Sequence, residues 1–266
     1  MDKTPVVSVL MGIFYRHNDI TLLKRSVDSI LNQTFTSFEL LVCDDGSVPT
    51  ATTYMDEVAA LDPRVRLIRS GTLFTLPSKL NACLSAAQGT WIARMDDDDF
   101  SYPERFSVQL EYLHAHPQFS FVGCNVNLWR DGAIVGQRML PEFPTVQNFY
   151  FVQPYIHPTL IFRRDALSAI GGYSEDPSCI LCEDYDLLLR LYAAGYSGAN
   201  LQKYLFDYTI PPTAKGRRTM RHRWNETVTR YRRFRDLGVL PQTLPYIIKP
   251  IIVGLLPEQI LRKLKK

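Results

Sequence analysis

Short apolar segments alternate with helical patterns over the first hundred residues, and this alternation constrains the fold most strongly. The apolar segments are rich in β-branched residues, as buried strands are, and the segments between them have apolar or small residues at helical spacing. Strands that alternate with helices form a mostly parallel, Rossmann-like sheet flanked by helices, so the expected class is α/β. The predicted strands are residues 5–14, 38–47, 65–69 and 90–95, and the predicted helices are residues 18–31, 53–61 and 79–87.

The pattern changes after residue 119. Two apolar segments flank Asp131-Gly132, a pair typical of the tight turn in a β-hairpin. Before them, Ser101 and Glu104 have the spacing of a capping box, which predicts that Ser101 caps a helix. The later elements predicted are a helix at 145–151, a strand at 159–162, a break at Gly171-Gly172 and a helix at 184–194 that ends at Gly195.

Composition excludes several classes of protein. The 266 residues are 46% hydrophobic and 21% charged, unlike a disordered, collagen-like or coiled-coil chain. The five cysteines are odd in number and scattered, which favours a reducing compartment over a secreted disulfide scaffold. Cys179 and Cys182 form a CxxC without a second pair, so we interpret both as ordinary thiols. We expect no signal peptide, and no apolar run reaches the roughly 18–20 residues that span a bilayer.

Positive charge is concentrated in a C-terminal tail, residues 215–266. This tail contains 14 Lys and Arg and three acidic residues, a formal charge of +11, whereas the rest of the chain carries −8. Its arginines are mixed with aromatic and aliphatic residues, which favours an anionic membrane surface as a partner. The alternative is that the apolar residues pack on the body and the arginines face solvent. We expect a helical tail interrupted at Pro245, Pro250 and Pro257, and no nucleic-acid partner, because no binding module accompanies the basic run.

Two predicted strands end in acidic residues, Asp44-Asp45 and Asp96–Asp99. Ligands of open α/β sheets bind beyond the carboxyl ends of the strands. Four consecutive carboxylates repel one another unless a cation or solvent screens them, and Mg²⁺ and Mn²⁺ prefer oxygen ligands and substrate phosphates. The sequence therefore predicts a metal–diphosphate site. The alternatives are an acid-rich helix N-terminus for Asp96–Asp99 and a tight turn for Asp44-Asp45.

Two further motifs are ambiguous when each is taken alone. Glu183-Asp184 opens a strongly apolar helix, where an acid at the first turn is an ordinary stabiliser. His157-Pro158 precedes a predicted strand, where a histidine with satisfied hydrogen bonds is the commoner outcome. Their order along the chain favours a functional role for both.

The sequence resembles the family 2 glycosyltransferases, which are inverting enzymes of the GT-A fold. The resemblance covers about residues 5–195, and IARMDDDD and EDYDLLLRL are specific only in combination. The first strand departs from the family at Gly12-Ile13-Phe14, where members usually have a proline and a small residue. No clear Arg-x-His follows Tyr208, although His222 is a candidate substitute. The matching segments are VVSVLMGIFYRHN, SVDSILNQTFTSFELLVCDDGS, KLNACLSAAQGTWIARMDDDDFSYPERFSVQ, HPTLIFRRDAL, GGY and EDYDLLLRL.

The resemblance implies a nucleotide-sugar donor, with UDP expected, and a divalent cation, Mn²⁺ or Mg²⁺. The family's DxD metal motif maps to Asp96 and Asp98, although the register of Asp97 and Asp99 stays open. Its catalytic base maps to Asp184, which would take the proton of the acceptor hydroxyl. The residues expected at the donor are Asp44, Asp45, Lys79, Arg94 and Asp96, and those expected at the acceptor are His157, Gly171, Gly172, Tyr173 and Glu183.

The expected function is inverting sugar transfer to a hydroxyl of a glycan or lipid-linked acceptor in cell-surface polysaccharide synthesis, at the cytoplasmic face of the membrane. Residues 1–100 are expected to bind the nucleotide-sugar, residues 101–214 the acceptor, and residues 215–266 to form the basic extension. One alternative is a nucleotidyltransferase, which is disfavoured because VLMGIFYRHN has no glycine-rich basic loop. Another is a membrane-associated glycan-binding protein with a degenerate site, which the intact acids disfavour.

Overall fold

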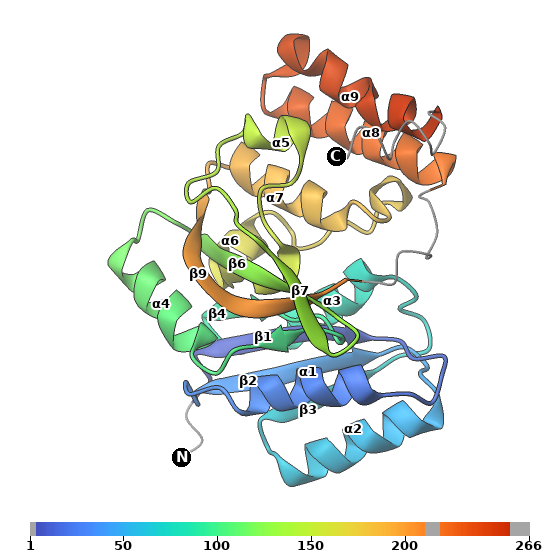
Figure 1. Cartoon of the computed structure of the whole chain (residues 1–266), viewed down its shortest axis with the longest axis vertical. Coiled ribbons are helices and arrows are strands. Elements are labelled where there is room, and N and C mark those ends of the chain that lie inside the picture. Colours follow the sequence, from blue (N-terminus) through green and yellow to red (C-terminus); the bar gives the residue numbers. More distant parts are fainter. Residues whose placement is uncertain (1–3, 211–218, 256–266) are drawn as a thin grey trace.

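The computed structural model describes residues 4–210 and 219–255, which form one curled nine-stranded sheet with helices against its faces (Figure 1). The order of its strands is β3-β2-β1-β4-β8-β6-β9-β5, and β7 pairs with β6. The elements are β1 (Val7–Ile13), α1 (Thr21–Leu31), β2 (Phe38–Asp44), α2 (Pro49–Leu61), β3 (Val65–Arg69), α3 (Leu76–Ala86), β4 (Trp91–Arg94), β5 (Phe100–Ser101), α4 (Arg105–Ala115), β6 (Phe121–Arg130), β7 (Ala133–Arg138), α5 (Asn148–Phe151), the 3-10 turn η1 (His157–Thr159), β8 (Ile161–Arg163), α6 (Arg164–Ala169), the 3-10 turn η2 (Pro177–Cys179), α7 (Glu183–Ala193), β9 (Gly198–Thr209), α8 (Met220–Asp236) and α9 (Leu240–Leu255).

Strands β3, β2, β1 and β4 are parallel, which confirms the Rossmann-like pattern expected for the first hundred residues. All seven residues of β2 are buried, as its continuous apolar run predicts for a strand covered on both faces. In the register, Ile13 of β1 pairs with Asp44 of β2, which pairs with Arg69 of β3. The acidic residues that follow β2 and β4 therefore lie at the same edge of the sheet.

The second half of the sheet is mixed. Strand β8 is antiparallel to both β4 and β6, whereas β6 is parallel to the long strand β9. The predicted hairpin between β6 and β7 is present, and Asp131 and Gly132 both have positive φ, 48° and 88°. The capping box predicted at Ser101 is wrong: Ser101 lies in β5, which pairs with β9, and α4 begins only at Arg105. Pairing with a distant strand outweighed the local signal.

The described part of the C-terminal tail packs on the body. Helix α8 contacts α7 and η2, and Phe234 and Ile247 are buried in the same apolar cluster as α7. The expectation that prolines interrupt the tail is wrong for Pro245 and Pro250, because α9 runs through both. Packing of its inner face on the body outweighs the low helix propensity of proline. Pro257 and the tail residues 215–218 and 256–266 lie outside the described residues.

A buried carboxylate joins α7 to α8. Asp186 is fully buried and accepts hydrogen bonds from Arg190 Nε and Arg233 Nε, each at 2.7 Å. These two arginines compensate the charge that Asp186 brings into the interior. The tail is thus attached to the body by charge pairing as well as by apolar contact.

The Asp186→Asn variant tests this attachment. Removing one partner of a buried ion pair leaves the arginines uncompensated, so we expect the free energy of unfolding to fall by ~3–5 kcal/mol. Asp165→Asn is the control, because the Arg163–Asp165 pair is exposed and should contribute no more than ~1 kcal/mol. Urea unfolding followed by circular dichroism measures both. Equal losses in the two variants would contradict the role given to Asp186.

Candidate active site

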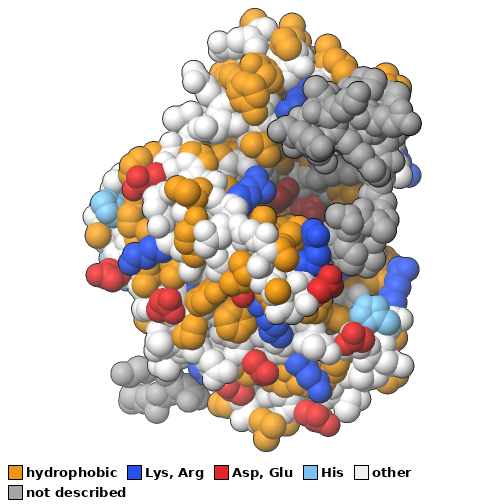
Figure 2. Space-filling model, in the orientation of Figure 1, with side chains coloured by type: hydrophobic (Ala, Val, Ile, Leu, Met, Phe, Trp, Pro, Cys, Tyr) orange, Lys and Arg blue, Asp and Glu red, His pale blue; other side chains and the backbone are white. Residues whose placement is uncertain are grey.

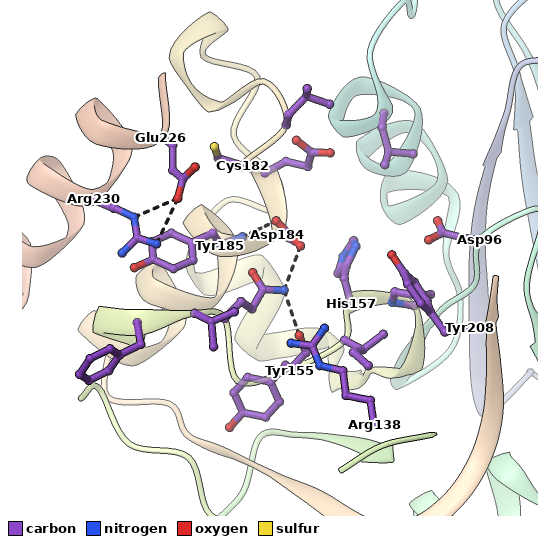
Figure 3. A pocket seen from close by; sticks show the side chains of 18 residues that line it. Asp96, Arg138, Tyr155, His157, Cys182, Asp184, Tyr185, Tyr208, Glu226 and Arg230 are labelled. Atoms are coloured by element: carbon purple, nitrogen blue, oxygen red, sulfur yellow. Dashed lines mark hydrogen bonds and ion pairs between the residues drawn. The ribbon is translucent and has the colours of Figure 1, made fainter. Parts of the chain in front are cut away.

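A cavity of about 490 Å³ opens beyond the carboxyl end of β4. The start of α7 and the η1 turn form its walls, with contributions from α8 and from the residues after α5. Figure 3 has Asp184 on one side and Asp96 on the other, with His157 and Tyr208 between them. The cavity is lined by Leu76, Asp96, Arg138, Phe151, Val152, Gln153, Tyr155, Ile156, His157, Pro158, Leu181, Cys182, Glu183, Asp184, Tyr185, Tyr208, Glu226 and Arg230.

Asp184 lies in the first turn of α7 and is held by two hydrogen bonds. Its Oδ1 accepts the backbone N–H of Tyr185 at 2.7 Å, and its Oδ2 accepts Gln153 Nε2 at 2.9 Å. Leu181, just before the helix, has a φ of 62°, and the chain turns there before α7 begins. The neighbouring Glu183 also lines the cavity, and burial followed by repulsion from Asp184 raises its pKa to about 7. The predicted base and its neighbour therefore face one cavity.

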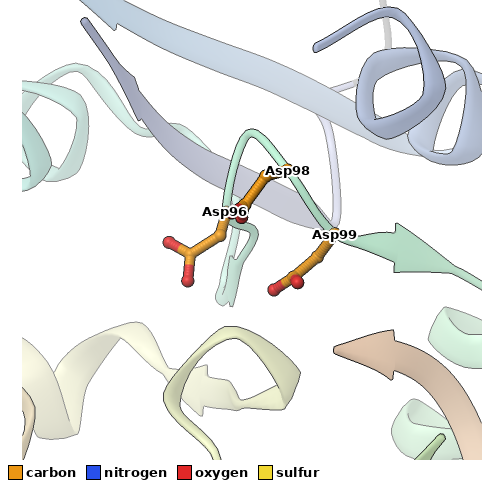
Figure 4. Close-up of side chains that lie close together, drawn as sticks. All are labelled: Asp96, Asp98 and Asp99. Atoms are coloured by element: carbon orange, nitrogen blue, oxygen red, sulfur yellow. The ribbon is translucent and has the colours of Figure 1, made fainter. Parts of the chain in front are cut away.

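Three carboxylates gather after β4. Asp96, Asp98 and Asp99 each place an oxygen within 4.8 Å of the others (Figure 4). Asp99 Oδ1 accepts the backbone N–H of Thr209 at 2.7 Å, so the end of β9 fixes this side chain. Asp99 Oδ2 is buried and has no hydrogen-bond partner. Buried polar atoms normally have partners, so this oxygen is available to a ligand.

The carboxyl groups after β4 raise one another's pKa, because each negative charge disfavours ionisation of its neighbours. Burial, followed by repulsion from its neighbours, raises the pKa of Asp97 to about 7 and that of Asp98 to about 6. The same causes raise the pKa of Asp99 well above its ordinary value. A divalent cation with oxygen ligands would remove this repulsion, and Asp96, Asp98 and Asp99 fit its donor chemistry.

Arg94 holds the side chain of Asp96 in position. Its guanidinium is almost fully buried and donates to a carboxylate oxygen of Asp96 and to the carbonyl of Leu10. Arg94 does not line the cavity, so in this structure it positions Asp96 and does not face a ligand directly. From the sequence, Arg94 was expected to contact the nucleotide-sugar. Because it is buried, its role here is to hold Asp96, which lines the cavity.

Asp44 and Asp45 lie at the end of β2, beside a second hollow of about 320 Å³ lined in part by Asp44. Each also stabilises a loop: Asp44 Oδ1 accepts the N–H of Ser47 at 3.0 Å, and Asp45 Oδ1 accepts that of Leu73 at 3.1 Å. The tight turn is therefore present, and the hollow beside it remains accessible. Lys79 is buried nearby, and its Nζ donates to the carbonyl of Ile13 at 3.0 Å.

The residues predicted at the acceptor separate into two groups. His157 lines the cavity, and its Nε2 lies 2.8 Å from the hydroxyl of the buried Tyr173. Burial and the charge of Arg94 lower the pKa of His157 well below its ordinary value, so the ring is neutral at pH 7. Gly171 and Gly172 do not line the cavity; they form a turn with φ of 73° and 69° that places Tyr173 behind His157.

Several cavity residues were not predicted from the sequence. Arg138 comes from β7, Gln153 from the segment after α5, Tyr208 from β9, and Glu226 and Arg230 from α8. These residues are far apart in the sequence and form no motif. Only the curled sheet and the packing of α8 bring them together. The candidate His222 has a structural role, because it lies in the capping box that begins α8.

Comparison with known proteins identifies related chains. The family model described as "Glycosyl transferase family 2" matches residues 13–171. "Putative glycosyltransferase EpsE" of Bacillus subtilis is 32% identical over 267 residues, covering 100% of this chain and 95% of that protein. An Escherichia coli protein named "UDP-Gal:alpha-D-GlcNAc-diphosphoundecaprenol beta-1,3-galactosyltransferase" is 27% identical, covering 96% of this chain and 94% of the other.

Solved structures share the fold at low identity. The structure of S. aureus TarS 1–349 in complex with UDP-GlcNAc superposes with a TM-score of 0.71 at 16% identity, covering 91% of this chain and 72% of that one. The mannosyltransferase PcManGT of Pyrobaculum calidifontis, in complex with GDP-Man and Mn²⁺, has a TM-score of 0.64 at 18% identity, covering 99% and 80%. These similarities confirm the GT-A fold expected from the sequence.

Replacing Asp97 by asparagine tests the raised pKa of this carboxyl group, which burial and then repulsion from Asp98 and Asp96 cause. Because the folded-state pKa of Asp97 is about 7 against an ordinary 3.8, the folded protein holds a proton between these values that the unfolded chain releases. The free energy of unfolding therefore falls as the pH rises toward 7. In EDTA we expect Asp97→Asn to be more stable than the wild type by ~1–3 kcal/mol at pH 8 and by less at pH 5.

Urea unfolding at both pH values measures this difference. Asp28→Asn, on the exposed face of α1, is the matched control and should change stability little at either pH. A stability difference for Asp97→Asn that is the same at both pH values would rule out a raised pKa at this position.

Proposed function

The chain belongs to glycosyltransferase family 2, and we propose that this glycosyltransferase acts by a single displacement that inverts the anomeric configuration. The observation that carries the proposal is that Asp96 and Asp184 line one cavity from opposite sides. Inversion requires a base on the acceptor side of the sugar and stabilisation of the leaving group on the other side. Two separate groups of acids facing one cavity meet this requirement.

The proposed donor is a nucleotide-sugar, with UDP as the nucleotide. Asp44 and Asp45 at the end of β2 would contact the base or ribose, and the diphosphate would extend toward Asp96, with Lys79 and Arg94 contributing positive charge. Two observations support UDP: the Escherichia coli relative is named for UDP-Gal, and the structure of TarS was obtained with UDP-GlcNAc.

The proposed cofactor is Mn²⁺ or Mg²⁺, held by Asp96 and Asp98 with Asp99 as a third ligand. The grouping of Asp96, Asp98 and Asp99 supports this assignment over the register of Asp97 and Asp99, because Asp97 lies outside the group. The unpartnered, buried Asp99 Oδ2 supports Asp99 as the third ligand. When bound, the cation would neutralise the charge that develops on the departing diphosphate. The Mn²⁺ in the structure of PcManGT is consistent with this choice of ion.

Asp184 is the proposed catalytic base. As the acceptor hydroxyl attacks the anomeric carbon, the bond from that carbon to the diphosphate oxygen breaks, and the hydroxyl proton passes to Asp184. A carboxylate is a weak base for an alcohol, so alignment must supply much of the rate. The hydrogen bonds from Gln153 and from the N–H of Tyr185 fix the carboxylate for this purpose. Glu183 and His157 would contact the acceptor.

The proposed acceptor is a glycan or a lipid-linked glycan of cell-surface polysaccharide synthesis, reached at the cytoplasmic face of the membrane. The relative named for transfer to a diphosphoundecaprenol-linked sugar supports a lipid-linked acceptor. Gly171 and Gly172 would act indirectly, by placing Tyr173 against His157. Membership of a glycosyltransferase family and an intact set of acids weigh against both the nucleotidyltransferase and the glycan-binding alternatives.

Asp184→Asn tests the base assignment. Without a carboxylate to accept the proton, we expect the rate of nucleotide release from the donor to fall at least ~100-fold. Donor binding should persist, and the stabilisation of the folded protein by UDP and Mn²⁺ in a thermal-shift assay measures it. Nucleotide release can be followed with water in place of the acceptor, using the nucleotide-sugar that stabilises the protein most.

Glu183→Gln is the matched control, because it removes the adjacent carboxylate and leaves Asp184 in place. We expect it to retain most of the nucleotide release. Turnover of Asp184→Asn close to that of the wild type would remove Asp184 from the role of base.

A further inference from the structure

Helix α9 has an apolar face that the described residues leave exposed. Its inner face is buried through Thr243, Ile247 and Pro250. The outer face carries apolar residues at spacings of four and then three residues, which we call the α9 stripe. The stripe consists of Leu244, Ile248, Ile252 and Leu255, whose side chains are 50%, 49%, 52% and 71% exposed. Contiguous exposed apolar residues on a monomer are typical of an interaction site.

The first turns of α8 expose two further large apolar side chains. Met220 and Trp224 are both exposed, and Met220 Sδ lies 2.7 Å from the position that a Cβ on Gly254 would occupy. The N-terminal end of α8 therefore touches the last turn of α9. Figure 2 shows hydrophobic side chains gathered at the top of the molecule, where Figure 1 places α9. Tryptophan is typical of surfaces that are apolar on one side and wet on the other.

The charge around the α9 stripe is positive. Residues 219–255, which the structure describes, contain seven Lys and Arg and two acidic residues. Arg232 and Arg233 are paired with Asp176 and Asp186 of the body. Arg221 and Lys249, in contrast, are exposed on α8 and α9. An apolar face with basic residues beside it complements an anionic lipid surface.

Helix α9 also borders the catalytic cavity, through residues outside the α9 stripe. Helix α5 packs against α9, and the rings of Phe151 and Tyr246 lie 4.8 Å apart between centroids. Lys249 Nζ donates to the carbonyl of Phe151 at 3.0 Å. Phe151 and Val152 are exposed, and both line the catalytic cavity and an adjoining groove of about 400 Å³. The side of α9 that carries Tyr246 and Lys249 therefore borders the cavity that contains Asp184.

We propose that the α9 stripe lies in the interfacial plane of an anionic membrane. Within the described ranges, no helix is long and apolar enough to span a membrane. This membrane contact does not depend on the proposed function.

Flotation of the full chain with vesicles tests the membrane contact. The vesicles are phosphatidylcholine alone or phosphatidylcholine with phosphatidylglycerol. We expect the wild type to float with the anionic vesicles, and less so as salt is raised. The double variant Ile248→Asn, Ile252→Asn should lose at least ~10-fold in partition, because about half of each isoleucine side chain is exposed and would move from water into an apolar phase.

Leu61→Asn is the matched control. Leu61 is 85% exposed at the end of α2, which lies at the opposite end of the molecule from α9 (Figure 1). It removes an exposed apolar side chain of similar size and should float like the wild type. A comparable loss in Leu61→Asn would overturn the assignment of binding to α9.

Three further results would overturn the proposal. The first is a wild type that does not float with anionic vesicles. The second is a double variant that floats as well as the wild type, as it would if residues 256–266 alone bound the lipid. The third is a wild-type dimer that the double variant converts to a monomer in sedimentation, because the α9 stripe would then be an interface between two copies.

The test is independent of catalysis. Asp184→Asn should float like the wild type, and the double variant should keep its stabilisation by UDP and Mn²⁺. If Asp184→Asn retains turnover while the double variant fails to float, the base assignment fails and the membrane contact stands.

Discussion

Repulsion among carboxylates held close together after β4 is the constraint on which the rest of this site depends. Asp96, Asp98 and Asp99 place oxygens within 4.8 Å of one another, in a setting where burial already raises the pKa of Asp98 and Asp99. Arg94 offsets part of the negative charge through its ion pair with Asp96, and the N–H of Thr209 donates a hydrogen bond to one oxygen of Asp99. The remaining repulsion is what a divalent cation would relieve, so the fold is built around a charge that its own residues do not fully neutralise.

The curled sheet explains why this cluster faces a second acid. The parallel strands β1, β2 and β4 bring the residues that follow them to one edge, and β9 curls over to meet Asp99. Helix α7 then begins on the far side of the cavity and presents Asp184 to it. The separation matters chemically, because a base placed beside the cation ligands would be drawn into binding the metal. The ion pairs of Asp186 join α8 to α7, so the tail that completes the cavity wall through Arg230 is part of the folded body.

Local signals in the sequence predicted the parallel half of the fold well. Strand β3 was predicted at its observed bounds, Val65–Arg69, and the hairpin at Asp131-Gly132 follows from the positive φ that this turn requires. Predictions were wrong where contacts between residues far apart in the sequence determine the local structure. Ser101 pairs with β9, and α9 continues through Pro245 because it packs on the body. The acids of the cavity could be found in the sequence because they lie in motifs, whereas Tyr208 and Gln153 could not, because folding alone brings them to Asp96 and Asp184.

The most direct test is a crystal structure of the wild type with UDP and Mn²⁺, in which anomalous scattering locates the manganese. The account predicts one manganese peak bound by carboxylate oxygens of Asp96, Asp98 or Asp99, with the diphosphate of UDP between that peak and the side of the cavity that holds Asp184. Manganese bound elsewhere, with UDP absent from the edge of the sheet at β2 and β4, would contradict it.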